Sequence, residues 1–125
     1  CHIEVAVHSV KNWGGRHENE DRHMAHQDTF GSVNFHTIGV LDGHDTDSAS
    51  DLVARTLPGV LSKQLKEGKT IEQGYVAAMA ELEDALKKIH ASAGTCVCSC
   101  TVAGRYVWCA NLGDCRAVLL PLQVP

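Results

Sequence analysis

The chain has 125 residues, of which 44% are hydrophobic, and 11 Lys and Arg face 15 Asp and Glu for a formal net charge of −4. This length and apolar content fit one domain with a hydrophobic core. The acidic balance makes a nucleic-acid partner unexpected, and no apolar run approaches the roughly 20 residues of a transmembrane helix. Residue 1 is Cys rather than Met, so a removed targeting segment is left open.

Residues 2–8 (HIEVAVH) alternate between apolar and polar side chains and predict a half-buried strand. A turn follows at residues 11–15, and the next segment, RHENEDR, is a dense run of charges that is typical of a solvated surface. The run becomes functional only if Arg16, Glu20 and Asp21 converge, with a guanidinium for an anion beside paired carboxylates. His23 and His26 are expected to be exposed, and residues 27–32 to form a hairpin loop.

Residues 34–44 (NFHTIGVLDGH) predict a buried strand that ends at Asp42, Gly43 and His44. A carboxylate, a glycine carbonyl and an imidazole then meet where the strand reaches the surface. Mg²⁺ and Mn²⁺ prefer oxygen ligands, so this tip suits a hard metal ion. The alternative interpretation is an ordinary Asp-Gly turn after a strand.

Residues 45–65 and 70–89 carry apolar side chains at helical spacing and predict two helices. Ser48 with Asp51 resembles a capping box at the start of the first helix, and the Thr70-x-x-Gln73 pattern begins the second. Pro58 is expected to bend the first helix or to divide it into two shorter ones.

Residues 96–102, 106–111 and 115–120 predict a three-stranded meander. The whole order predicts an α+β fold in which two helices lie on one face of an antiparallel sheet. The last eleven residues are apolar and contain no Asp or Glu, so we expect something to cover them.

Of the six cysteines, Cys96, Cys98 and Cys100 alternate within one predicted strand and share a face. No pair has the C-x-x-C spacing of a zinc knuckle. We interpret the cysteines as buried free thiols, which favours a reducing compartment such as the cytoplasm or an organelle interior. A disulfide role, or a small metal-binding or redox module, is the alternative.

Four segments in order resemble the metal-dependent serine/threonine protein phosphatases, the PPM or type-2C family. They are GRHENED at residues 15–21, IGVLDGH at 38–44, AGTC at 93–96 and VWCANLGDCRAVL at 107–119. The corresponding family patterns are G-R-x-x-x-E-D, G-V-[FLY]-D-G-H, S-G-[ST]-[TA] and V-A-N-[VL]-G-D-S-R-A-V-L. The resemblance implies that residues 1–125 are a single partial domain, the N-terminal half of the family's helix-flanked β-sandwich.

The resemblance also implies a binuclear Mg²⁺ or Mn²⁺ centre that activates water to hydrolyse phosphoserine and phosphothreonine in a phosphoprotein substrate. Arg16 would bind the phosphate, and His44 would protonate the leaving alkoxide. The implied metal ligands, side chains except for one backbone carbonyl, are Glu20, Asp21, Asp42, Gly43 and Asp114.

The chain departs from the family pattern in two ways. Asp45 and Thr46 follow His44 where the family has two glycines, and no carboxylate follows Asp114 to match the family's later metal-binding aspartates. We therefore expect the chain as it stands to hold an incomplete or inactive site. The alternative is a non-catalytic phosphatase-like subunit of a larger assembly, in which a partner protein covers the apolar tail and the open sheet edges.

Overall fold

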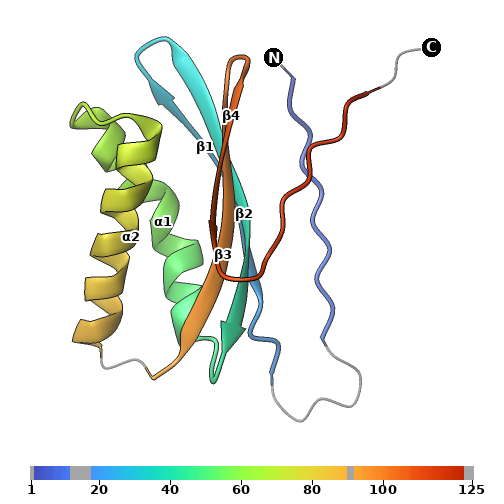
Figure 1. The fold of residues 1–125 in the computed structure, drawn as a ribbon, viewed down its shortest axis with the longest axis vertical. Coiled ribbons are helices and arrows are strands. Elements are labelled where there is room, and N and C mark those ends of the chain that lie inside the picture. The colour runs from blue at the N-terminus through green and yellow to red at the C-terminus, as the bar shows by residue number, and fades with distance from the viewer. Residues whose placement is uncertain (1, 12–17, 90–91, 123–125) are drawn as a thin grey trace.

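A computed structural model describes residues 2–11, 18–89 and 92–122. The elements are β1 (Arg22–Phe30), β2 (Val33–His44), α1 (Ser48–Lys66), α2 (Ile71–Lys88), β3 (Gly94–Ala103) and β4 (Tyr106–Leu112). The strands form one antiparallel sheet in the order β1-β2-β3-β4, and both helices lie on one of its faces (Figure 1). The predicted α+β fold is therefore confirmed. Neither described helix is both long and apolar enough to cross a membrane.

The longest strand, β2, lies inside the sheet and pairs with β1 on one side and β3 on the other. Its register with β3 sets Asp42 directly opposite Cys96. Two-residue loops join β1 to β2 and β3 to β4, and each contains a glycine with positive φ, Gly31 at 62° and Gly104 at 59°. Such loops match the twist of a tight hairpin.

The core lies between the sheet and the helices. Alternate residues of β2 face the helices, and Phe35, Thr37 and Leu41 are all nearly inaccessible to solvent. Two apolar clusters fill this layer, one around Leu41 and Leu57 and one around Phe35 and Leu61. Because the buried residues of β2 lie on its helix-facing side, the polar residues Asp42 and His44 at its tip lie on the opposite side.

The helices differ from their predictions in detail. α1 has Asp47 as its N-cap, and the Asp47 side chain accepts no hydrogen bond from the first turn of the helix, so the expected Ser48 capping box is wrong. The capping box at Thr70 and Gln73 of α2 is present in full. α1 also runs as one helix through Pro58, so of the two outcomes expected there, a bend or a division, the division into two helices is wrong. Pro58 is itself buried in the core, and this packing offsets the cost of a proline inside a helix.

The first strand of the sheet includes residues that the sequence predicts as loop. A hairpin loop was expected at residues 27–32, but β1 covers Arg22–Phe30 and the loop is confined to residues 31 and 32. His23 and His26 are exposed, as expected, and Met24 is the one fully buried residue of the strand. An edge strand with so few buried positions shows no alternation of apolar and polar side chains, which is the pattern that would have predicted it.

Two predicted strands, at residues 2–8 and 115–120, are not formed among the described residues. Both segments instead run beside each other over the sheet face that lacks helices (Figure 1). With Ile38 and Cys98 they line a cavity of 210 Å³. Val5 remains 45% exposed and Leu119 85% exposed. Alternation predicts a strand only where a neighbouring strand supplies hydrogen bonds, and here these segments form no ladder.

Candidate metal centre

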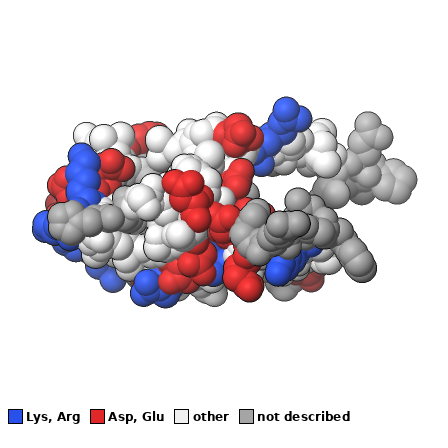
Figure 2. Space-filling model, turned by 90° about the horizontal axis from the view of Figure 1, so that it is seen from below, with Lys and Arg blue, Asp and Glu red and all other residues white. Residues whose placement is uncertain are grey.

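The candidate site lies at the C-terminal tip of β2, where Asp42 is exposed and faces away from the core. A Cβ atom at the next residue, Gly43, would overlap the carbonyl oxygen of Glu20 and the side chain of Ser50. Glycine is therefore required for the segment before β1 to approach the strand tip. Figure 2 views this end of the molecule and shows Asp and Glu side chains gathered on it.

Two side chains hold the segment before β1 in place. The Ser50 hydroxyl of α1 donates a hydrogen bond of 2.5 Å to the Glu20 carbonyl oxygen. Arg22 donates from Nη1 to the Asp21 carbonyl oxygen at 2.8 Å, and from Nη2 to Asp47 Oδ2 at 2.7 Å. The start of α1 thus fixes the backbone that carries Glu20 and Asp21.

Four of the predicted metal ligands come together in one pocket of 160 Å³, which Glu20, Asp21, Asp42 and Gly43 help to line. Burial raises the pKa of Asp21, and the nearby Asp42 raises it further through its charge and a shared hydrogen bond, while Arg22 acts in the opposite direction. These closely spaced carboxylates, together with a backbone carbonyl, form an oxygen donor set that fits Mg²⁺ or Mn²⁺.

The fifth predicted ligand, Asp114, lies in the turn after β4 and joins a second group. Ligand atoms of Asp42, Cys96 and Asp114 all lie within 4.8 Å of one another. Asp42 therefore belongs to both groups. Cys96 could not be identified as a ligand from the sequence, because only the pairing of β2 with β3 sets it opposite Asp42.

Of the two predicted catalytic residues, the structure describes only His44, which stands apart from these groups. His44 is exposed and its imidazole lies over Gly94, its cross-strand partner, where an added Cβ would overlap the ring. His44 does not line the pocket shared by Glu20 and Asp42. Arg16 lies outside the described residues, so both catalytic roles stay predictions.

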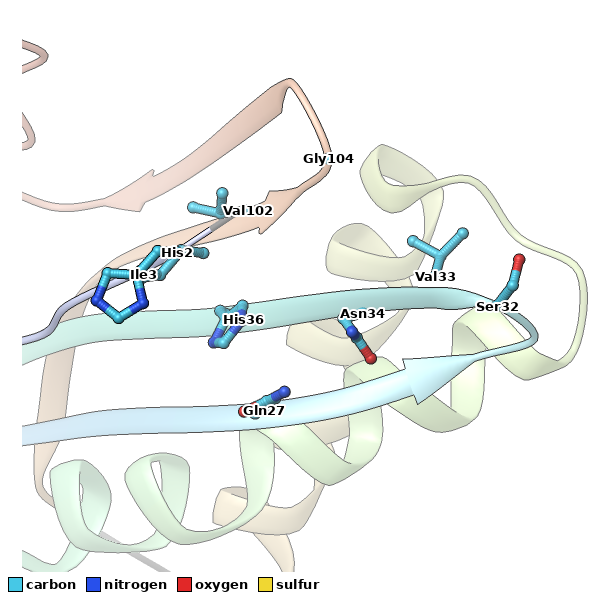
Figure 3. A pocket seen from close by; sticks show the side chains of 9 residues that line it. All are labelled: His2, Ile3, Gln27, Ser32, Val33, Asn34, His36, Val102 and Gly104. Carbon is cyan, nitrogen blue, oxygen red and sulfur yellow. The ribbon is translucent and has the colours of Figure 1, made fainter.

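A larger cavity, of 520 Å³, lies at the opposite end of the sheet (Figure 3). Its polar lining comes from His2, Gln27, Asn34 and His36, with Ser32 at the hairpin. Carboxylates and thiols are missing from its described lining. The pocket at the β2 tip, with its acidic donors, therefore suits a hard cation better than this larger cavity does.

Comparison with known proteins finds similarity to one family of phosphatases. Residues 4–123 match the family described as Protein phosphatase 2C. "Probable protein phosphatase 2C 32" of Oryza sativa subsp. japonica is 31% identical over 93% of this chain and 31% of its own length. "Probable protein phosphatase 2C 43" of Arabidopsis thaliana is 38% identical over 65% of the chain and 22% of its own length. "Protein phosphatase 1L" of Bos taurus is 27% identical over 92% and 35%. The chain thus spans about a third or less of the length of these relatives.

Proposed function

This chain belongs to the protein phosphatase 2C family, and on that premise we propose that its protein hydrolyses phosphoserine and phosphothreonine in phosphoproteins with Mg²⁺ or Mn²⁺. The observation that carries the proposal is the meeting of Glu20, Asp21, Asp42 and Gly43 around one pocket. These residues come from separate segments, and the oxygen atoms they offer are the donors that hard cations require.

In this proposal Asp42 holds the central position, since it lies in both ligand groups and can serve more than one cation. Bound Mg²⁺ or Mn²⁺ would supply an activated water and neutralise charge on the phosphoryl group. The Gly43 carbonyl and the side chains of Glu20, Asp21 and Asp114 would complete the ligands from this chain. Arg16 would bind the phosphate and His44 would protonate the leaving group.

We further propose that residues 1–125 form part of one phosphatase domain and supply only part of its ligand shell. The alternative function, a non-catalytic subunit docked in a larger protein assembly, is favoured by the exposed apolar side chains near the C-terminal end. Leu119 is 85% and Leu122 is 94% exposed. An exposed apolar surface of this kind is typical of a contact with another protein segment. β1 and β4 are also open sheet edges.

The deciding experiment measures phosphate release from a phosphothreonine peptide with and without Mn²⁺. The protein is expressed from its complete reading frame, so that any sequence on either side of these residues is included. Asp42→Asn should lower the Mn²⁺-dependent rate by at least about a hundredfold, because metal stabilisation of the transition state is worth several kcal/mol. The exposed Asp84 of α2 provides the control, since Asp84→Asn should retain the rate.

Full activity in Asp42→Asn would contradict the proposed metal site. A folded wild-type protein that releases no phosphate with either metal would contradict the enzymatic function. That result would favour the docked, non-catalytic alternative.

A further inference from the structure

One side chain at the β2 tip does not fit a purely oxygen-based metal site. Cys96 of β3 lies directly opposite Asp42 in the sheet, so the two side chains project from the same face. The sulfur of Cys96 and carboxylate oxygens of Asp42 and Asp114 all lie within 4.8 Å of one another. Three separate elements therefore direct one donor each toward a common point.

The turn after β4 accounts for the third donor. Gly113 has a φ of 105°, and a Cβ atom there would overlap the Cys96 sulfur. The turn thus closes directly over the thiol and carries Asp114 to it. Asp42 and Asp114 are exposed and Cys96 is half-buried, so a cation can reach the donors from solution.

The donor chemistry distinguishes between metals. Mg²⁺ takes oxygen ligands almost exclusively, whereas a thiolate favours borderline cations such as Zn²⁺ and Co²⁺. Two carboxylates and one thiolate are three ligands of types that Zn²⁺ accepts, and tetrahedral coordination leaves a fourth position for water or substrate.

We propose that Asp42, Cys96 and Asp114 form a mixed sulfur and oxygen site that binds Zn²⁺ in preference to Mg²⁺. The inference rests on the proposed function only in taking Asp42 and Asp114 as metal ligands. Cys96 stands where the phosphatase resemblance has Thr or Ala, so this sulfur ligand is a feature of this chain. Zn²⁺ bound here would hold β2, β3 and the turn after β4 together through one ion.

The test is a titration of the protein, again expressed from its complete reading frame, with Co²⁺ as a spectroscopic substitute for Zn²⁺. Coordination by Cys96 produces a sulfur-to-cobalt charge-transfer absorption in the near ultraviolet. Cys96→Ser should abolish this band, and Zn²⁺ should displace the cobalt at a lower concentration than Mg²⁺ does.

The matched control is Cys109→Ser, because Cys109 is an exposed thiol of β4 that lies outside the cluster. This control should retain the band. Thermal unfolding checks that each variant is folded. If Cys96→Ser does not fold, Asp114→Asn decides instead. It should weaken cobalt binding by about tenfold or more, since loss of even an outer partner of a metal ligand commonly costs that much.

No charge-transfer band in the wild-type protein, or a band that persists in Cys96→Ser, would overturn the inference. Unchanged cobalt affinity in Asp114→Asn would overturn it as well. Absence of the band alongside Mn²⁺-dependent phosphate release would reject the sulfur site and leave the proposed phosphatase intact. The band without phosphate release would reject the phosphatase and keep the sulfur site.

Discussion

The backbone around the β2 tip depends on individual residue types. Gly43 allows the Glu20 carbonyl to approach, and an added Cβ there would overlap it. Two residues later, Asp45 has a φ of 72°, the only positive φ of a non-glycine residue in the described chain. A side chain in this left-handed region costs free energy, although Asp tolerates it better than most residues. Asp45 stands where the phosphatase pattern has glycine. The turn therefore has the left-handed backbone conformation that glycine favours, although the residue is Asp.

At this scale we predict that Asp45→Gly raises the free energy of unfolding by about 0.5 kcal/mol, because relief of the left-handed strain exceeds the added entropy of the unfolded chain. Urea denaturation measures the change. The control is Asp84→Gly within α2, where the same substitution should lower the unfolding free energy by about 0.3 kcal/mol. Equal effects of the two substitutions would show that backbone strain at Asp45 contributes nothing.

At the scale of elements, α2 is joined to the sheet by a buried network of hydroxyl groups. Tyr75 of α2 hydrogen bonds through its hydroxyl to Ser99 Oγ at 2.8 Å and to Thr101 Oγ1 at 2.7 Å. Thr37 of β2 lies 3.4 Å from Thr101, oxygen to oxygen. All four residues are buried. The network therefore fixes the position of α2 over β3, beyond what apolar packing requires.

We predict that Tyr75→Phe lowers the free energy of unfolding by about 1 to 3 kcal/mol, because it removes the partner of two buried hydroxyl groups. The matched control is Tyr106→Phe, since Tyr106 is 68% exposed and its loss of a hydroxyl should change stability by no more than about 0.5 kcal/mol. Chemical denaturation of both variants gives the comparison. Similar values for the two would mean that the network adds no stability.

At the scale of the molecule, the two terminal segments cover part of the sheet face opposite the helices. This face carries the thiols of Cys98 and Cys100, and residues of both segments help to line the cavity around them. Burial, together with the neighbouring Cys109, raises the pKa of each thiol to about 11. The folded protein therefore keeps both thiols protonated at a pH where unfolded cysteines ionise.

The raised pKa of these thiols leads to a prediction for the stability of the protein in alkaline solution. The folded pKa lies above the unfolded value of 9.0, so the stabilising contribution is complete below about pH 9 and is lost as the pH rises toward about 11. The free energy of unfolding should decrease across this window. Cys98→Ala should make the decrease shallower, as measured by denaturation at a series of pH values. The same slope in wild type and variant would contradict the raised pKa.

The sequence by itself determined the elements that depend only on residues close to one another in the chain. The apolar period of α2 and its Thr70 capping box are each contained within one segment, and β2 is indicated by branched residues that end at Asp42 and Gly43. The ordered motifs also predicted that Glu20 and Asp42 belong to one site, and both line one pocket in the structure.

Only the tertiary structure decided how distant segments pair. In the structure, β1 is a strand although its sequence shows no alternation of apolar and polar residues, and residues 2–8 and 115–120 pair with no strand. The pairing of β2 with β3 also sets Cys96 beside Asp42. Helix periodicity and capping act between residues a few positions apart, so a sequence records them directly. The pairing of β2 with β3 joins residues 50 or more positions apart, and its register depends on the packing of the whole sheet.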